Sequence, residues 1–243
     1  MNGAPAAGGP TLLSSLMELL LPRACVGCGQ DGSAWCPHCL EVEFDPVLHR
    51  PDPCPPMLPS LAAAATYSGS VRSAVLAAKE RDRRELDRPL GAMLAAAVGL
   101  LITSEPVRAS RLLPLWLVPV PASPAALRSR GRDHVSDWTR WTVRCLRAAK
   151  IAARCIPALR RTSSGLDSVG LDAAARAVNL RGAFALGRIS APPQGTILIV
   201  VDDIVTTGAT LAAASICLST GFDLDPEQLG AAVVAATQRH RAL

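Results

Sequence analysis

Apolar residues recur along the chain at two spacings, one typical of helices and one of strands. Spacings of three and four residues predict helices over Ser70 to about Asp82, Leu86 to Ile102, His134 to about Lys150 and Leu171 to Leu180. Short β-rich runs predict strands at Leu115 to Val120, around Ala183 to Leu186, at Thr196 to Val201 and at Leu229 to Ala236. Because the two kinds of segment alternate, we expect an α/β domain with a largely parallel sheet flanked by helices.

The run from Thr196 to Val201 predicts a central strand, because it is apolar without interruption, as in strands buried on both faces. Asp202 and Asp203 follow it, and a short loop then leads into an apolar helix over Leu211 to Ser219. Open α/β sheets bind ligands at the carboxyl ends of their strands. We therefore expect both acids at a ligand site.

The loop after these acids has the composition of a phosphate-binding loop. Backbone N–H groups at a helix start, together with the hydroxyls of Thr206, Thr207 and Thr210, can surround a phosphate, and Gly208 permits close backbone approach. The neighbouring carboxylates can accept hydrogen bonds from vicinal sugar hydroxyls. Together these groups predict a pocket for ribose 5-phosphate.

The N-terminal region holds a Leu-rich stretch, Leu12 to Leu21, which we interpret as a short amphipathic or core helix. It differs from a signal peptide because no basic residue precedes it, it contains Glu18, and no convincing cleavage site follows. The apolar runs Leu58 to Ala65 and Leu90 to Ile102 are shorter than the roughly 18 to 20 residues of a membrane span. We expect a cytoplasmic protein with no membrane span.

Four of the eight cysteines form two Cys-x2-Cys pairs separated by seven residues. Such pairs turn tightly enough for four thiolates to converge on one tetrahedral ion. The spacing predicts a structural zinc site; disulfides or free thiols are the alternative. The four cysteines are Cys25, Cys28, Cys36 and Cys39. The role of Cys54, in the Pro-rich segment that follows, stays open.

That Pro-rich segment divides the chain, because six prolines between residues 45 and 59 are incompatible with an ordinary helix. We expect an N-terminal helix and a four-cysteine zinc module over residues 1–44, a linker over 45–60 and an α/β domain over 61–243.

Charge and aromatic content narrow the classes of partner. The 243 residues carry a net charge of +5, and Lys79 and Lys150 are the only lysines. Arg forms forked contacts with phosphate and carboxylate groups. Only 3% of the residues are aromatic, which weighs against a platform for stacked bases. Phosphate recognition is therefore favoured over base stacking.

The segment His134 to about Lys150 contains residues that invite a functional interpretation. Trp138 and Trp141 fall at helical spacing with Cys145 and Leu146, which favours a place in the core. His134 follows Asp133, but consecutive residues on a helix do not face each other. We therefore expect His134 in an exposed first turn rather than in an acid/base pair.

The segment Val200 to Thr210 resembles the signature of the type I phosphoribosyltransferases, which binds 5-phosphoribosyl 1-diphosphate. The rest of the chain is similar to the ComF/GntX family, in which cysteine knuckles precede such a domain. Matching elements are Tyr67-Ser68-Gly69 with Lys79, Val118-Pro119-Val120-Pro121 with Arg130-Gly131, and Arg160-Arg161-Thr162 with Leu171, Arg176, Asn179 and Gly182-Ala183-Phe184. The resemblance covers essentially the whole chain in the expected order.

The resemblance implies a role for each of these segments. Asp202 and Asp203 would hold the 2- and 3-hydroxyls, and Val205, Thr206, Thr207, Gly208, Ala209 and Thr210 would form the 5-phosphate loop. The segment Val118 to Ser123, with Pro121 and Ser123, would be the diphosphate loop. Arg128, Arg130 or Lys79 would add positive charge there, and a lid over Arg160 to Asn179 would bring in Arg160, Arg161 and Arg176. Mg2+ is the expected cofactor beside structural Zn2+.

The chain departs from the family at three places. It has Arg132-Asp133-His134 where Phe-Asn-Gln is usual, Asp167 where Gln is common, and Glu80 in place of an aromatic residue. The ribose-phosphate motif is unchanged, so these departures bear on the acceptor or on the diphosphate.

Three functions fit these features: a phosphoribosyltransferase of unidentified acceptor, a sensor of phosphoribosyl diphosphate, and a DNA-handling protein of competence. For the third, the partners would be single-stranded DNA or DNA-uptake proteins, bound through phosphates.

Overall fold

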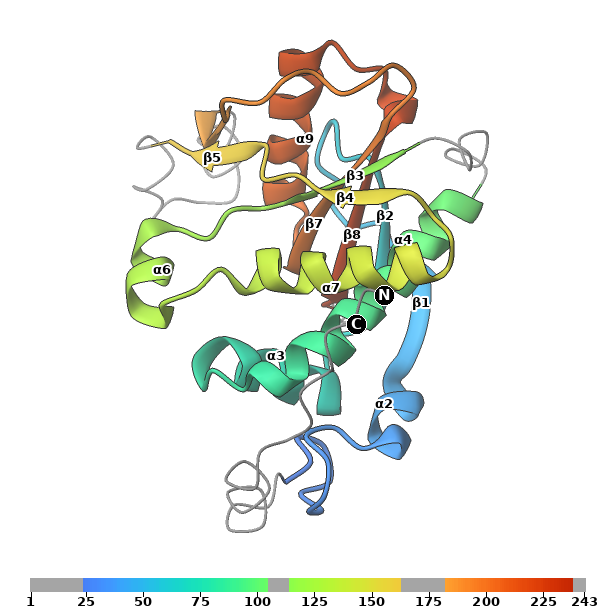
Figure 1. Ribbon diagram of the computed structural model, residues 1–243, viewed down its shortest axis with the longest axis vertical. Coiled ribbons are helices and arrows are strands. Elements are labelled where there is room, and N and C mark those ends of the chain that lie inside the picture. Colours follow the sequence, from blue (N-terminus) through green and yellow to red (C-terminus); the bar gives the residue numbers. More distant parts are fainter. Residues whose placement is uncertain (1–23, 105–113, 163–181, 238–243) are drawn as a thin grey trace, which may run out of the picture.

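A six-stranded sheet organises the fold, with the strand order β1-β2-β8-β7-β3-β4 (Figure 1). The computed structural model describes residues 24–104, 114–162 and 182–237. The strands of this sheet are β1 (Phe44–Leu48), β2 (Ser60–Thr66), β3 (Leu115–Pro119), β4 (Ala153–Cys155), β7 (Ile197–Val205) and β8 (Leu229–Ala236). β1 is antiparallel to β2, and the other four pairings are parallel. The predicted α/β class with a largely parallel sheet is confirmed.

Helices cover both faces of this sheet. The helices are α2 (Pro37–Glu43), α3 (Gly69–Glu80), α4 (Asp87–Thr103), α6 (Pro124–Arg130), α7 (His134–Ala148) and α9 (Ala209–Phe222), with 3-10 turns η1 (Arg84–Leu86) and η4 (Pro226–Gln228). Side chains alternate along the strands, so Ile197 and Ile199 pack in the same apolar cluster as α3, α4 and α7. Leu198 and Val200 point the other way, toward α9 and a hairpin of β5 (Leu159–Arg161) and β6 (Phe184–Leu186).

Small residues let the helices approach closely on the face covered by α4. Strand β2 carries four consecutive alanines, and Ala62 and Ala64 belong to the core beneath α4. Where α4 crosses α7, a Cβ on Gly91 would collide with Trp141 and lie 2.9 Å from the carbonyl oxygen of Trp138. Interiors are close-packed, so a larger residue here would push the two helices apart.

Most of the predicted elements are present, with shifted ends. β7 continues through Asp202 and Asp203 to Val205, because its ladder with β8 runs as far as the pair Val205 and Ala236. α9 begins at Ala209, earlier than the predicted Leu211. The predicted helices at Leu12 to Leu21 and Leu171 to Leu180 lie outside the described residues.

The first part of the predicted linker is a strand. β1 covers Phe44–Leu48 and follows α2 directly, so the cysteine-rich turns connect to the sheet without a spacer. β1 contains Pro46, which fits an edge strand because an edge leaves one row of backbone groups unpaired. Residues 49–59 form a loop in which Leu58 packs against the cluster beneath α9.

The segment Arg84–Thr103 is long and apolar enough to cross a membrane by length and composition. In this fold 56% of its most apolar window is buried, and α4 packs against α7, β2 and β8. The packing is that of a core helix.

Candidate functional site

A cavity of about 410 Å³ opens at the carboxyl edge of the parallel strands, beside the ends of β3 and β7. Its wall comes from the segment after β3, the starts of α6 and α7, strand β5 and the β7–α9 connection. The lining residues are Val120, Pro121, Ala122, Ser123, Ala126, Arg130, His134, Val135, Arg161, Asp202, Asp203, Ile204 and Thr210. Segments far apart in the sequence thus meet where open α/β sheets bind their ligands.

The two acids lie near the carboxyl end of β7, where pairing with β8 fixes their backbone. Asp202 is paired with Val233 of β8, so its position follows from the strand register. The Asp203 amide donates to Asp202 Oδ1 at 2.9 Å, and the Ile204 amide donates to Asp203 Oδ1 at 2.6 Å. These local bonds orient both carboxylates beside the cavity, as the sequence predicted for the strand end.

Two side chains from separate helices meet on Asp203. Lys79 Nζ, on the last turn of α3, lies 2.6 Å from Asp203 Oδ2, and His134 Nε2, at the start of α7, lies 2.9 Å from the same oxygen. His134 is only 3% exposed. The prediction of an exposed His134 was therefore wrong, because the partner that buries it lies 69 residues away, beyond any local pattern.

The two acids differ in their electrostatics. Burial and the adjacent negative charge of Asp203 raise the pKa of Asp202 to about 8. Burial also opposes ionisation of Asp203, but hydrogen bonding from His134 and the charge of Lys79 outweigh it and lower its pKa to about 2. Asp203 is thus the ionised member of the pair at neutral pH, and Asp202 keeps a proton within reach.

The predicted phosphate loop begins α9. Gly208 has a φ of 76°, a left-handed conformation that favours glycine. A Cβ there would lie 3.1 Å from Leu58 Cδ2 and 3.2 Å from Pro51 Cγ, so the 49–59 loop closes this side. The Ala209 amide donates to Thr207 Oγ1 at 3.4 Å. Thr210 lines the cavity, whereas the other predicted loop residues do not: Val205, Thr206, Thr207, Gly208 and Ala209.

The predicted diphosphate segment and two of the predicted arginines reach the cavity. Ser123 Oγ accepts from the Ala126 amide at 3.1 Å and begins α6. Arg161 Nε donates to the carbonyl oxygen of Pro121 at 2.8 Å, and Arg130 forms an ion pair with Glu80 at 2.8 Å. Within the described residues, Nε of Arg130 is buried and has no hydrogen-bond partner.

The remaining predicted cations lie elsewhere. Arg160 is exposed, and its Nε donates to the carbonyl oxygen of Leu186 at 3.3 Å. Arg128 is also exposed and does not line the cavity. Arg176 and most of the predicted lid, Arg160 to Asn179, lie outside the described residues.

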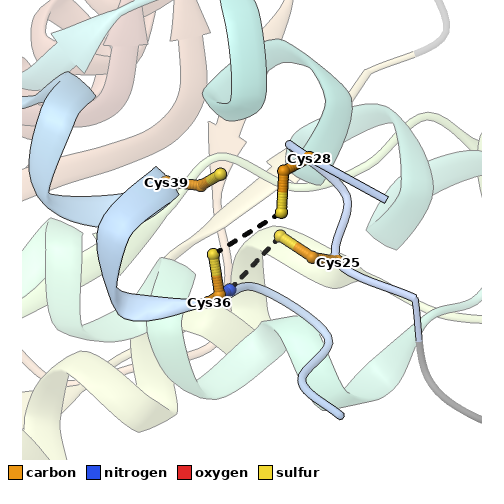
Figure 2. A group of neighbouring side chains, drawn as sticks. All are labelled: Cys25, Cys28, Cys36 and Cys39. Atoms are coloured by element: carbon orange, nitrogen blue, oxygen red, sulfur yellow. Dashed lines mark hydrogen bonds between the residues drawn. The ribbon is translucent and has the colours of Figure 1, made fainter. Parts of the chain in front are cut away.

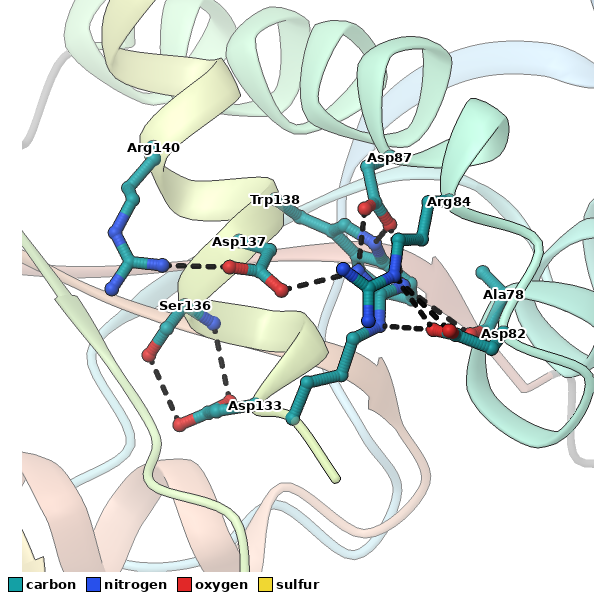
Figure 3. A network of polar contacts seen from close by, with 10 residues as sticks. Ala78, Asp82, Arg84, Asp87, Asp133, Ser136, Asp137, Trp138 and Arg140 are labelled. Carbon is teal, nitrogen blue, oxygen red and sulfur yellow. Dashed lines mark hydrogen bonds and ion pairs between the residues drawn. The ribbon is translucent and has the colours of Figure 1, made fainter. Parts of the chain in front are cut away.

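A buried polar network supports the start of α7 (Figure 3). Arg132 makes a forked ion pair with Asp87, at 2.5 Å to Oδ2 and 2.8 Å to Oδ1, and Trp138 Nε1 donates to Oδ1 at 2.7 Å. Arg132 also pairs with Asp82 and Asp137. The sequence does not predict this network, because Asp87 lies 45 and 51 residues from its partners Arg132 and Trp138.

The four predicted metal-ligating cysteines do converge (Figure 2). Their sulfur atoms all lie within 4.8 Å of one another, and Cys28 Sγ is 3.8 Å from Cys36 Sγ. A tetrahedral ion with metal–sulfur bonds of about 2.3 Å separates its sulfurs by roughly 3.8 Å, so the cluster fits a metal ion. Contact with Cys36, burial and the charge at Cys25 raise the pKa of Cys39 to about 12. A bound cation would relieve this crowding of thiolates.

Backbone N–H groups also favour a thiolate in this cluster. The amides of Cys36 and Gly27 donate to Cys25 Sγ at 3.3 Å and 3.4 Å. Although burial opposes ionisation, these bonds lower the pKa of Cys25 to about 6. A Cβ on Gly27 would lie 2.8 Å from Cys39 Sγ, so glycine keeps the sulfur positions free.

The cysteine-rich turns are attached to α3 by side-chain contacts. The Glu43 carboxylate accepts from the amides of Ser70 and Val71, at 2.6 Å and 3.3 Å, and so caps the start of α3. Ser70 Oγ donates to the carbonyl oxygen of Cys39 at 2.9 Å and accepts from Trp35 Nε1 at 3.2 Å. In Figure 1, α3 lies between these turns and α7. The same helix thus contacts the cysteine cluster at one end and Asp203 at the other.

Comparison with known proteins adds no relative: no family model matches the chain, and no curated protein matches it. The residues described above therefore carry the functional assignment.

Proposed function

We propose that the chain binds 5-phosphoribosyl 1-diphosphate and transfers its phosphoribosyl group or senses its presence. One observation carries the proposal: Asp202, Asp203 and Thr210 share one cavity with Arg130 and Arg161 at the carboxyl edge of a parallel sheet. Carboxylates accept from sugar hydroxyls and arginines bind phosphate oxygens, so one ligand with a ribose and phosphates at both ends engages all of them. The resemblance of Val200 to Thr210 to the phosphoribosyltransferase signature agrees with this chemistry.

The residues would divide the ligand between them. The segment Thr206 to Thr210, which leads into α9, would hold the 5-phosphate with backbone N–H and hydroxyl groups. The pair of acids would form the ribose subsite, while Arg130 and Arg161 would neutralise charge on the diphosphate. Departure of diphosphate leaves a cation-like anomeric carbon, which an incoming nucleophile of the acceptor attacks; positioning and exclusion of water are the protein's main contributions.

Two metal ions belong to this proposal. Mg2+ would bridge diphosphate oxygens and neutralise their charge, and Asp202, with a carboxylate oxygen beside the cavity, offers the kind of ligand that Mg2+ prefers. Zn2+ is the ion that we assign to the four cysteines, because four thiolates at tetrahedral spacing form a closed structural site. Elemental analysis of metal-replete protein tests the assignment: about one equivalent of zinc is expected, and less than about half an equivalent counts against it.

Isothermal titration with 5-phosphoribosyl 1-diphosphate and Mg2+ tests the main proposal. Wild-type protein should bind, and the double variant Asp202→Asn/Asp203→Asn should not. Equal affinities, or no binding by either protein, would refute it. Arg128→Gln serves as a matched control, because this arginine is exposed and does not line the cavity, so its loss should leave the affinity nearly unchanged.

A second candidate is a DNA-handling role in competence, in which the cavity is regulatory. The charge distribution favours it: the segment Arg128 to Arg161 contains ten Lys and Arg residues and only two acids, Asp133 and Asp137. Arg140, Arg144 and Arg147 are exposed on α7. Phosphate-backbone binding would appear in a gel shift as a steep fall in affinity with salt. Failure to shift single-stranded DNA at low salt removes this candidate.

A further inference from the structure

The two acids of the cavity have unequal hydrogen bonding. Both oxygens of Asp203 are engaged: Oδ2 accepts from Lys79 Nζ and His134 Nε2, at 2.6 Å and 2.9 Å, and Oδ1 accepts from the Ile204 amide at 2.6 Å. Within the part of the chain that the structure describes, Asp202 Oδ1 accepts only from the Asp203 amide, at 2.9 Å. Across residues 24–104, 114–162 and 182–237, no group bonds to Asp202 Oδ2.

We propose that the acids have separate tasks: Asp203 is a fixed anchor held by His134 and Lys79, and Asp202 alone meets the sugar hydroxyls. The inference rests on the proposed function and specifies how its ribose subsite works. His134 and Lys79 are then positioning residues, which act on the ligand through Asp203 and the end of β7.

The surroundings of His134 fix the orientation of its imidazole ring. Nε2 faces Asp203, whereas Nδ1 is buried and has no hydrogen-bond partner among the described residues. The ring lies edge-on to Trp138, with centroids 5.0 Å apart. Because a carboxylate only accepts hydrogen bonds, Nε2 is the donor in the contact with Asp203, and Lys79 adds a full positive charge on the same carboxylate oxygen.

The position of His134 is fixed from the residues just before it. Asp133 caps α7, with Oδ1 accepting from the Ser136 amide at 3.2 Å. Arg132, one residue earlier, joins this helix to α4 through Asp87. Where the chain departs from the ComF/GntX pattern, each of the three side chains has a partner inside the protein. One of these three residues, His134, thus holds Asp203 in place.

The ligand-binding test compares single variants by titration with 5-phosphoribosyl 1-diphosphate and Mg2+. Asp202→Asn should weaken binding at least tenfold more than Asp203→Asn, because the asparagine at 203 keeps an acceptor for Lys79 and His134. His134→Gln should bind within about threefold of wild type, since the glutamine amide can donate to Asp203, whereas His134→Leu should bind at least tenfold more weakly. Equal losses in Asp202→Asn and Asp203→Asn overturn the division of tasks.

A ligand-free test separates this inference from the proposed function. In urea unfolding, His134→Leu should couple with Asp203→Ala, which removes the acceptor for His134, so that the double variant changes the unfolding constant at least fivefold less than the product of the single changes. The same substitution should combine multiplicatively with Asp202→Asn. Nitrogen NMR of wild-type protein should show the His134 proton on Nε2.

The outcomes are distinct. Absence of wild-type binding refutes the proposed function and, with it, the role of Asp202. Multiplicative behaviour of His134 with Asp203, or an Nε2 that carries no proton, overturns the anchor whether or not the ligand binds. A destabilised His134→Leu does not obscure the result, because His134→Gln provides the folded comparison.

Discussion

Asp202 shows how one residue can link protonation to ligand binding. Burial and the neighbouring Asp203 raise its pKa to about 8, so the group is mostly protonated at neutral pH before a ligand binds. A protonated carboxyl is a poorer acceptor for sugar hydroxyls and a poorer ligand for a cation. Binding that uses the carboxylate must therefore remove this proton.

We predict that affinity for 5-phosphoribosyl 1-diphosphate rises with pH. The ionised fraction of a group with a pKa of about 8 grows from about a tenth at pH 7 to about nine tenths at pH 9, so binding should strengthen roughly ninefold. The sign is positive because the ligand selects the deprotonated form. Titration calorimetry at several pH values measures it; Asp202→Asn should abolish the rise, and a pH-independent wild type would contradict the prediction.

Arg132 and Asp87 form an ion pair that is nearly buried, with side-chain exposures of 10% and 9%. Removing one partner leaves the other charge desolvated, which typically costs about 3–5 kcal/mol. We expect Arg132→Met to lower the free energy of unfolding by about 3 kcal/mol in urea denaturation. Arg140→Met is the matched control: its side chain is 60% exposed, and the loss of its pair with Asp137 should cost less than about 1 kcal/mol.

The backbone conformation of the connection from β7 to α9 depends on one glycine. Gly208 combines a φ of 76° with close contacts to Leu58 and Pro51. Gly208→Ala should destabilise the protein by about 1–2 kcal/mol, because an L-residue is strained in this conformation. Urea denaturation measures the loss. In Gly99→Ala, within α4, the new Cβ meets no atom within 4 Å, so stability should be unchanged or raised by up to about 1 kcal/mol; equal effects would contradict the account.

The sequence predicted these elements where the signal was local. The apolar run of β7, the spacing of α3, α4 and α7, and the cysteine pairs each depend on nearby residues, and the structure contains all of them. Strand β2 was not predicted because its four alanines have low β propensity, and β4 and β5 were not predicted because three residues carry little periodic signal. β1 was missed because prolines dominated its surroundings, and Pro46 is tolerated there only by the edge position.

The candidate site, too, could be predicted only where the sequence signal is local. The acids and the cavity-lining arginines could be named from motifs, but the partners of Asp203 could not, since Lys79 and His134 are 124 and 69 residues away from it. Such pairings depend on how the helices pack on the sheet. Local spacing holds no information on them.

At the scale of the whole molecule, α3 connects the cysteine cluster to the cavity. Glu43 and Ser70 join its first turn to the cysteine-rich turns, and Lys79 on its last turn reaches Asp203. Arg83, just beyond the helix, also donates to the carbonyl oxygen of Ala24 at 3.1 Å. Disorder at the cysteines would therefore loosen the helix that carries Lys79.

We expect metal removal to act on α3 as well as on the cysteines. Stripping the metal with a chelator should lower the Tm by roughly 5 °C or more, equivalent to about 2 kcal/mol for a chain of this size. Amide exchange should accelerate in residues 69–80, and the change should reverse when zinc is restored. Unchanged exchange in α3 would show that the cluster stabilises only its own turns. Glu43→Gln, which keeps the metal ligands, should reproduce part of the faster exchange.

The direct junction of α2 and β1 limits how the chain can be shortened. A fragment that begins after Leu48 would lose the edge strand together with the cysteines, and the backbone groups of β2 that face β1 would lose their partners, while those that face β8 stay paired. Unprotected edges of this kind recruit strands from other molecules. A truncated α/β domain should therefore self-associate through β2. A shortened chain that keeps both β1 and the four cysteines should begin before Cys25, not between the cysteine-rich turns and the sheet.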